Sequence, residues 1–154
     1  QGLGKVTSPG RLEIIRRGPT VLVDVAHNPH GARSLFNALQ TEVDFEYLVA
    51  IVGMFADKDA DQFLSTLQPA INHLIVTQTS HERALPVSDL HSIAANYFEA
   101  DQLDLRPDVA SSIEYAIELA DQVMIEQESG VGILITGSVY TVAQARALLG
   151  KLYA

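Results

Sequence analysis

Apolar and polar positions along this chain alternate between two patterns, continuous apolar runs and apolar residues repeated at helical spacing. The runs predict buried strands, and the spaced residues predict amphipathic helices. The predicted strands cover residues 12–16, 21–24, 47–53, 73–77, 103–106 and 131–136. The predicted helices cover residues 29–39, 60–67, 86–98, 107–128 and 142–149. The fourth of these helices is predicted to end before Gly130. Its inward-facing residues are predicted to be Ile113, Ala116, Ile117, Ala120 and Met124.

This order of strands and helices predicts the fold class. Alternating strands and helices with continuously apolar strands favour a mostly parallel sheet covered by helices on both faces. The first two strands are joined by a tight Gly18-Pro19 turn, so they should pair antiparallel. We therefore predict an α/β fold, a Rossmann-like three-layer sandwich of six strands, five of them parallel, with one antiparallel strand at the N-terminal edge.

Composition narrows the classes of protein. A chain of 154 residues with 47% hydrophobic residues is one domain with a real core. Its net charge of −9 argues against nucleic-acid binding. It has no cysteine, which fits a reducing compartment, and no apolar run near the roughly 20 residues that span a bilayer. We expect a cytoplasmic protein with neither nucleic acid nor a membrane as a partner.

The beginning of the chain has the composition of a linker. The first ten residues hold three glycines and one proline and no initiator methionine. We expect residues 1–8 to be the remnant of an interdomain linker and residues 9–154 to form a domain cut from a longer protein.

The strongest candidate site follows the second predicted strand, where Asp24, His27 and Asn28 come in quick succession. Ligands of open α/β sheets bind at the carboxyl ends of strands. Asp24 could accept a hydrogen bond from a hydroxyl or an amine, and His27 could donate one to an anion. Asn28 precedes Pro29 and is a natural helix cap. Asp24 and Asn28 could also serve only the turn and the helix, but two ionisable groups at one strand end favour a function.

Other strand ends carry weaker signals. Lys58 is either a solvated side chain or a phosphate contact, and Arg11, before the first strand, is either solvated or a ligand residue. Ser138 could cap the last helix and leave amides aimed at an anion, and Gly137 could let a ligand approach the backbone. Arg83 is the most anion-capable residue of the loop at 77–86.

Several catalytic patterns are missing from the sequence. No Gly-x-Gly-x-x-Gly fingerprint, Gly-x-Ser-x-Gly elbow or P-loop is present. The five histidines form no close metal-binding cluster. We therefore predict no metal ligands in this domain.

Four motifs at strand ends resemble a known family. They are Pro9-Gly10-Arg11-Leu12-Glu13, Asp24-Val25-Ala26-His27-Asn28-Pro29-His30-Gly31, Gly53-Met54-Phe55-Ala56-Asp57-Lys58-Asp59 and Thr136-Gly137-Ser138-Val139-Tyr140-Thr141-Val142. In this order they resemble the C-terminal domain of folylpolyglutamate synthase and dihydrofolate synthase, in the Mur ligase superfamily.

The resemblance implies an ATP-dependent amide ligase of folate biosynthesis and one-carbon metabolism. Such enzymes activate a folate or pteroate carboxyl as an acyl phosphate, which the amine of L-glutamate attacks. A larger N-terminal domain, absent from this chain, would carry the P-loop, the Mg²⁺ ligands and the folate pocket. The present domain would close over ATP and position glutamate, and would be inactive alone. Whether the protein acts on dihydropteroate, on reduced folates or on both stays open.

The resemblance also implies roles for single residues. Arg11 would contact the ATP phosphates, Asp24 the ribose or adenine side, and Lys58 the nucleotide as well. His27 would be the catalytic residue, near the phosphates or the incoming glutamate. Ser138 would help hold a glutamate carboxylate. One departure is that Val25 replaces the usual glycine, so a positive φ is not expected there.

Two alternatives remain at this point. One is another Mur-type ligase that adds a different amino acid. The other is a stand-alone flavodoxin-like module that binds a nucleotide or a protein.

Overall fold

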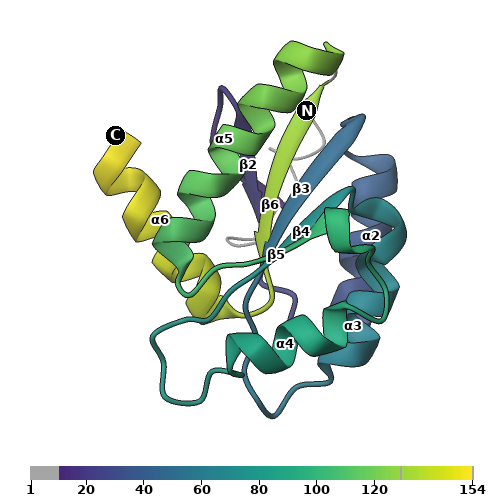
Figure 1. The fold of residues 1–154 in the computed structure, drawn as a ribbon, viewed down its shortest axis with the longest axis vertical. Helices are drawn as coiled ribbons and strands as arrows, with labels where there is room; N and C mark the ends of the chain where they lie inside the picture. Colours follow the sequence, from purple (N-terminus) through teal and green to yellow (C-terminus); the bar gives the residue numbers. More distant parts are fainter. Residues whose placement is uncertain (1–10, 129, 154) are drawn as a thin grey trace.

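Six strands form a single sheet with helices on both sides (Figure 1). The computed structural model describes residues 11–128 and 130–153. The predicted linker at residues 1–8 lies outside the described residues. The strands are β1 (Glu13–Arg16), β2 (Thr20–Val23), β3 (Tyr47–Val52), β4 (His73–Val76), β5 (Leu103–Leu105) and β6 (Val131–Thr136). The helices are α2 (Pro29–Thr41), α3 (Ala60–Leu67), α4 (Val87–Ala94), α5 (Val109–Gln127) and α6 (Val139–Tyr153), with short 3₁₀ turns η1 (Gln68–Ala70) and η2 (Ala100–Gln102).

The sheet has the order β1-β2-β6-β3-β4-β5. β1 pairs antiparallel with β2, and the other neighbours are parallel, as predicted. β6 comes last along the chain but lies between β2 and β3 and pairs with both. The carboxyl ends of these three strands are therefore neighbours.

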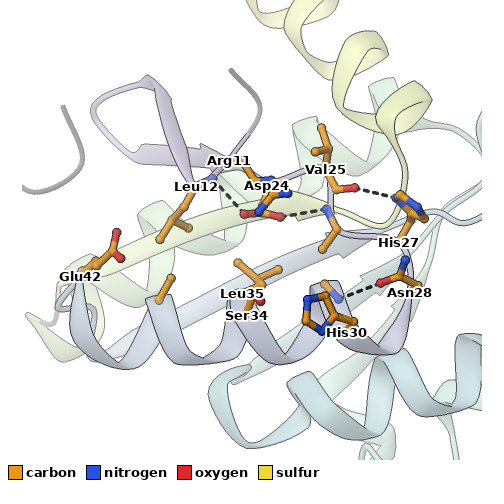
Figure 2. A pocket seen from close by; sticks show the side chains of 13 residues that line it. Arg11, Leu12, Asp24, Val25, His27, Asn28, His30, Ser34, Leu35 and Glu42 are labelled. Atoms are coloured by element: carbon orange, nitrogen blue, oxygen red, sulfur yellow. Dashed lines mark hydrogen bonds between the residues drawn. The ribbon is translucent and has the colours of Figure 1, made fainter. Parts of the chain in front are cut away.

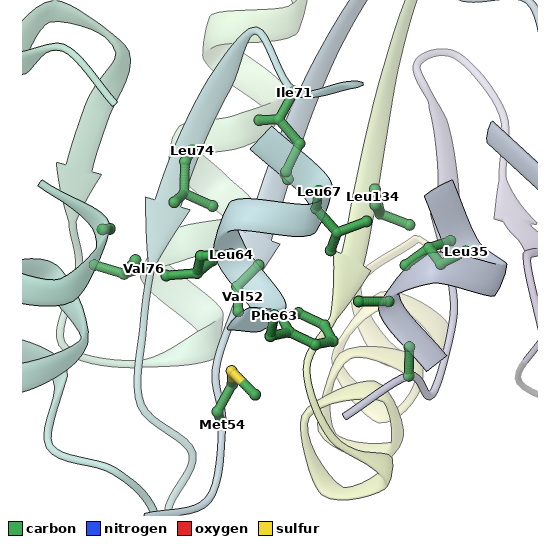
Figure 3. Packing of buried hydrophobic residues seen from close by; sticks show 14 of the residues in the cluster. Leu35, Val52, Met54, Phe63, Leu64, Leu67, Ile71, Leu74, Val76 and Leu134 are labelled. Atoms are coloured by element: carbon green, nitrogen blue, oxygen red, sulfur yellow. The ribbon is translucent and has the colours of Figure 1, made fainter. Parts of the chain in front are cut away.

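The strands are buried on both faces because alternate side chains point to opposite sides of the sheet. In β3, Ala50 and Val52 face α2, α3 and α4, whereas Val49 and Ile51 face α5 and α6. Figure 3 shows Phe63 of α3 at the centre of the first of these two cores. Within the described part of the chain, no helix is both long and apolar enough to cross a bilayer.

Two helices begin later than predicted. α4 starts at Val87 because Pro86 has an extended ψ of 138°, and it ends at Ala94, four residues early, where the following bonds tighten to three-residue spacing. α5 starts at Val109 because the side chain of Asp108 accepts a hydrogen bond from the Ser111 N–H. Pro86 and Pro107 thus lie outside the helices that they were predicted to begin.

The end of α5 also differs from the prediction. Glu128, not Gly130, ends the helix, with a left-handed φ of 52°. Met124 is 41% exposed, and Val123 is buried in its place. The helix is 19 residues long. Because its period is 3.6 residues, its buried face rotates along this length, and in the last turns it lies on Val123 and not on the predicted Met124.

A polar network ties the edge strand β5 to the rest of the sheet. His73 Nε2 lies 2.6 Å from a carboxylate oxygen of Asp104, and the Tyr115 hydroxyl donates to the same oxygen at 2.8 Å. Arg106 stacks over the Tyr115 ring, with its guanidinium carbon 4.1 Å from the ring centroid. Burial alone would raise the pKa of Asp104, but its hydrogen bonds from His73 and Tyr115 and the charges of His73 and Arg106 lower it below the usual value.

The lowered pKa of Asp104 predicts a pH dependence of stability. A carboxyl whose pKa is depressed in the folded state stabilises it above the unfolded pKa of about 4, and this contribution is lost as the pH falls through the folded value. The free energy of unfolding of Asp104→Asn should therefore lie below that of the wild type at pH 6, and the gap should shrink as the pH drops below about 4. Denaturant unfolding at a series of pH values measures the gap, and a gap that does not depend on pH would contradict the assignment.

Candidate functional site

The loops after β2, β6 and β3 are joined at the carboxyl edge of the sheet. The Gly137 N–H donates to the Ala26 carbonyl at 3.1 Å, and the Gly53 N–H donates to the Thr136 carbonyl at 3.3 Å. The Thr141 hydroxyl, in the first turn of α6, donates to the Gly53 carbonyl at 2.9 Å. The three loops therefore form one rigid edge.

Gly137 is a glycine for a packing reason. Its φ is +116°, which side chains rarely adopt, and a Cβ there would overlap the carbonyl oxygen of Gly53. The loop after β3 therefore fills the space that a Cβ of residue 137 would take, and the close approach of a ligand to this backbone stays a prediction.

Replacing Gly137 should weaken the whole edge. Gly137→Ala should lower the free energy of unfolding by about 3 kcal/mol, because it combines backbone strain with a steric overlap. Gly150→Ala is the matched control, since a Cβ at Gly150 meets nothing within 4 Å and its position is helical. The control should be neutral or stabilising by about 0.5–1 kcal/mol. Equal effects of the two substitutions in denaturant unfolding would refute the packing argument.

A pocket of about 370 Å³ opens beside this edge, between α2 and the segment that enters β1. Figure 2 shows Asp24 near its middle, with Arg11 and Leu12 on one side and α2 on the other. The pocket brings together four of the predicted site residues, Arg11, Asp24, His27 and Asn28. Lys58 and Ser138 are not among its lining residues.

The carboxylate of Asp24 is buried and bound on both oxygens. One oxygen accepts from the Leu12 N–H at 3.0 Å and the other from the Ala26 N–H at 2.8 Å. Burial raises the pKa of Asp24 above the usual value, and these two donors and the charge of Arg11 oppose the rise. Asp24 therefore has a structural task, which is to join the start of the domain to the β2–α2 turn, and each oxygen keeps a lone pair for a further donor.

Removal of this carboxylate should destabilise the fold. Asp24→Ala leaves two buried N–H groups without their acceptor, which should cost about 1–3 kcal/mol. Asp121→Ala is the control, because Asp121 is an exposed acid on α5, and it should change stability by less than about 0.5 kcal/mol. Thermal and denaturant unfolding measure both, and an unchanged Asp24→Ala would refute the structural task.

His27 and Asn28 directly precede α2 at the rim of the pocket. The Asn28 side chain accepts from the Gly31 N–H at 2.8 Å and Pro29 follows it, so the predicted cap is confirmed. His27 Nδ1 lies 3.1 Å from the Val25 carbonyl, an acceptor, so Nδ1 carries the proton and Nε2 is left for a ligand. No acidic residue lies in the first turn of α2, so the positive end of its dipole is open to an anion.

The loop residues Ser138 and Lys58 lie at other strand ends. Ser138 is 4% exposed, and its hydroxyl accepts from the Thr141 N–H at 2.9 Å and bonds the Thr141 hydroxyl. Its hydroxyl thus acts as a cap of α6. Lys58 follows β3, and its Nζ lies 4.0 Å from Asp57. Their predicted roles toward glutamate and ATP stay predictions.

Leu12 is a site residue that sequence reasoning missed. It was predicted to begin the first strand, but it precedes β1 with a left-handed φ of 43° and is 3% exposed. This conformation is uncommon for a leucine, and it aims the Leu12 N–H at Asp24. Nothing in the local sequence indicates it. Val25 has no positive φ, as expected.

The pocket suits an anionic ligand better than a metal ion. Arg11, His27, His30 and the N-terminus of α2 line it, whereas its one further acid besides Asp24 is Glu42, at the other end of α2. Among the described residues, no group of three or more His, Asp or Glu side chains could hold a metal ion. A guanidinium, two imidazole rings and a helix N-terminus beside one buried carboxylate fit a nucleotide, with phosphates near Arg11 and the helix N-terminus and hydroxyls near Asp24.

Comparison with known proteins decides the family. The family model of the Mur ligase glutamate ligase domain matches residues 10–139. The chain belongs to this family. A dihydrofolate synthase/folylpolyglutamate synthase from Mycobacterium tuberculosis is 39% identical over 97% of the chain. The chain spans about a third of that relative, 32% of its length.

Solved structures of similar proteins have the same fold. Folylpolyglutamate synthase of Mycobacterium tuberculosis, complexed with ADP and AMPPCP, has a TM-score of 0.90 at 40% identity, covering 97% of this chain and 34% of that one. A bifunctional folylpolyglutamate synthase/dihydrofolate synthase from Yersinia pestis, complexed with AMPPNP and Mn ion, has a TM-score of 0.73 at 27% identity, covering 97% of this chain and 33% of that one. These matches favour the ligase interpretation over a flavodoxin-like module.

Proposed function

We propose that this chain is the C-terminal domain of an ATP-dependent ligase that adds L-glutamate to folate or dihydropteroate. The γ-phosphoryl group of ATP passes to the acceptor carboxylate and gives an acyl phosphate and ADP. The amine of glutamate then attacks the acyl carbon, phosphate leaves, and an amide remains. The observation that carries the proposal is the pocket at the end of β2, which places Arg11, Asp24 and His27 together in a chain of this family.

Each of these residues has a role that suits its surroundings. Arg11, an exposed guanidinium at the pocket rim, binds phosphate oxygens. Asp24 accepts from a ribose hydroxyl through the lone pairs that Leu12 and Ala26 leave. His27, held through Nδ1, presents Nε2 to the phosphates or to the incoming amine. Since charge must be neutralised and reactants aligned, these residues act by position and electrostatics.

The remainder of the site belongs to a part of the protein beyond this chain. Similar proteins about three times as long bind nucleotide analogues, in one case with Mn ion. We propose that an upstream P-loop domain provides the ligands for Mg²⁺ and the folate pocket, and that this domain closes over ATP. Mg²⁺ would neutralise the phosphate charge during transfer. The domain alone is then not expected to be active, and the whole protein is expected to work in the cytoplasm.

The proposal predicts ligation by the full-length protein. ADP should form only when ATP, glutamate and a folate or dihydropteroate acceptor are all present. His27→Ala should lower kcat/KM by about a hundredfold, because a positioned partner of the reacting groups is lost. His91→Ala is the matched control, since His91 lies on α4, away from the pocket, and it should retain normal turnover.

Coupled ADP release and mass spectrometry of the product measure both variants. Normal turnover of His27→Ala would remove His27 from the site. A wild-type protein that forms no amide product with any folate acceptor would overturn the proposed function.

A further inference from the structure

The loop at residues 77–86, between β4 and α4, lies outside the pocket described above and is held against the loop that follows β3. The Ala56 N–H donates to the Arg83 carbonyl at 2.9 Å, and the Leu85 N–H donates to the Met54 carbonyl at 2.8 Å. Both are bonds between backbone groups, which do not titrate. The second half of the loop is therefore held in the same way at any moderate pH.

A histidine holds the first half of the same loop. His81 Nδ1 accepts a hydrogen bond from the Arg83 N–H at 3.0 Å. An imidazole nitrogen accepts a hydrogen bond only while it carries no proton, so the proton of neutral His81 is on Nε2. Of these three bonds, this is the one that depends on the protonation of a side chain.

The His81 ring lies between two aromatic side chains from neighbouring loops. Its centroid is 4.8 Å from that of Phe55, which follows β3, and 5.0 Å from that of Tyr140, in the first turn of α6. The loops after β3, β4 and β6 thus meet at this histidine, at the carboxyl edge of the sheet. The ring is half-buried, so solvent protons reach it.

The charges around this ring do not include an acid committed to it. The charged and titratable side chains where these loops meet are Asp57, Lys58, Glu82, Arg83 and Tyr140. The Asp57 carboxylate is shared between two cations, since it lies 3.6 Å from Arg83 and 4.0 Å from Lys58 Nζ. Glu82 is exposed, where salt screens its charge. The hydrogen bond from Arg83 therefore decides what the charge of His81 does to the loop.

Protonation of His81 removes the bond that holds the first half of the loop. Imidazole changes its charge between about pH 5 and pH 8. Imidazolium has two N–H donors and no acceptor, so the Arg83 N–H would face a donor and lose its partner. The Phe55 ring, tilted by 35° to the imidazole, attracts a cation through its face and keeps the charged ring in place. The backbone before Arg83 then has to move.

We propose that His81 is a pH-dependent switch of this loop. Its unprotonated ring holds residues 80–83 against the loops after β3 and β6, and its protonation releases them while the bond of Leu85 to Met54 stays. Release moves the Arg83 guanidinium, which is 62% exposed and lies beside Phe55 and Asp57 in the closed loop. Resting on the proposed function, this change of charge at the edge where α/β proteins bind their ligands slows ligation at acidic pH.

Hydrogen exchange of single amides in the full-length protein tests the switch. The measured quantity is the protection factor, which corrects for the intrinsic pH dependence of exchange. In the wild type, the protection of the Arg83 N–H should fall about tenfold or more from pH 8 to pH 5, because one hydrogen bond is lost and its donor is left unpaired. The protection of the Leu85 N–H should change much less, because its acceptor does not titrate.

Two substitutions separate the acceptor from the ring. His81→Asn keeps an acceptor near the place of Nδ1 but does not titrate, so the Arg83 N–H should stay protected at both pH values. His81→Phe keeps an aromatic ring but offers no acceptor, so the Arg83 N–H should be unprotected at both. His91→Phe is the matched control, since His91 is a half-buried histidine in the last turn of α4, and it should behave as the wild type.

The pH profile of ligation by the full-length protein tests the consequence. The ratio of kcat/KM for L-glutamate in the wild type to that in His81→Asn should fall several-fold from pH 8 to pH 5. Groups other than His81 titrate in both proteins, so their effects cancel in this ratio.

The possible failures are distinguishable. Equal protection of the Arg83 N–H at both pH values in the wild type, or a loss of protection in His81→Asn that follows the wild type, would overturn the switch. The expected exchange together with a constant ratio of kcat/KM would overturn its link to ligation. A wild-type protein that ligates no amino acid would overturn the proposed function, and the exchange result would still decide the switch.

Discussion

The arrangement of this domain depends on the insertion of β6 between β2 and β3. The chain leaves β2 toward α2 on one face of the sheet and leaves β6 toward α6 on the other. Neighbouring strands whose loops diverge in this way open a crevice at the carboxyl edge, where α/β proteins bind their ligands. The hydrogen bonds of Gly137 to Ala26 and of Gly53 to Thr136 hold that edge together. Without β6, the loops after β2 and β3 would not be joined at this edge.

Asp24 combines stability and recognition in one side chain. Its buried carboxylate accepts hydrogen bonds from the backbone N–H groups of Leu12 and Ala26, and these two bonds hold it in a single orientation. A group fixed before the ligand arrives loses little conformational freedom on binding. The same arrangement explains why the loss of function in an Asp24 variant cannot be assigned to binding alone, since its fold changes as well.

The sequence pattern predicted the strands well because buried parallel strands are continuous apolar runs, and it predicted the start of α2 because Asn28-Pro29 combines two strong signals. It failed at Pro86 and Pro107, where proline was read as the first helical residue although it precedes the helix. The place of β6 and the left-handed Leu12 are set by contacts distant in the sequence, and no local pattern reports them. For the same reason, the meeting of Phe55, His81 and Tyr140 was not predicted.

The place of β6 has a consequence for how the protein is made. The central strand is also the last strand to be synthesised, so a nascent chain that ends before Val131 holds β2 and β3 without the strand that joins them. The edges of β2 and β3 that pair with β6 stay unpaired until the ribosome has released β6. Such unpaired edges are prone to aggregation. A chain that ended before Val131 would therefore lack the middle of the sheet and not merely its margin.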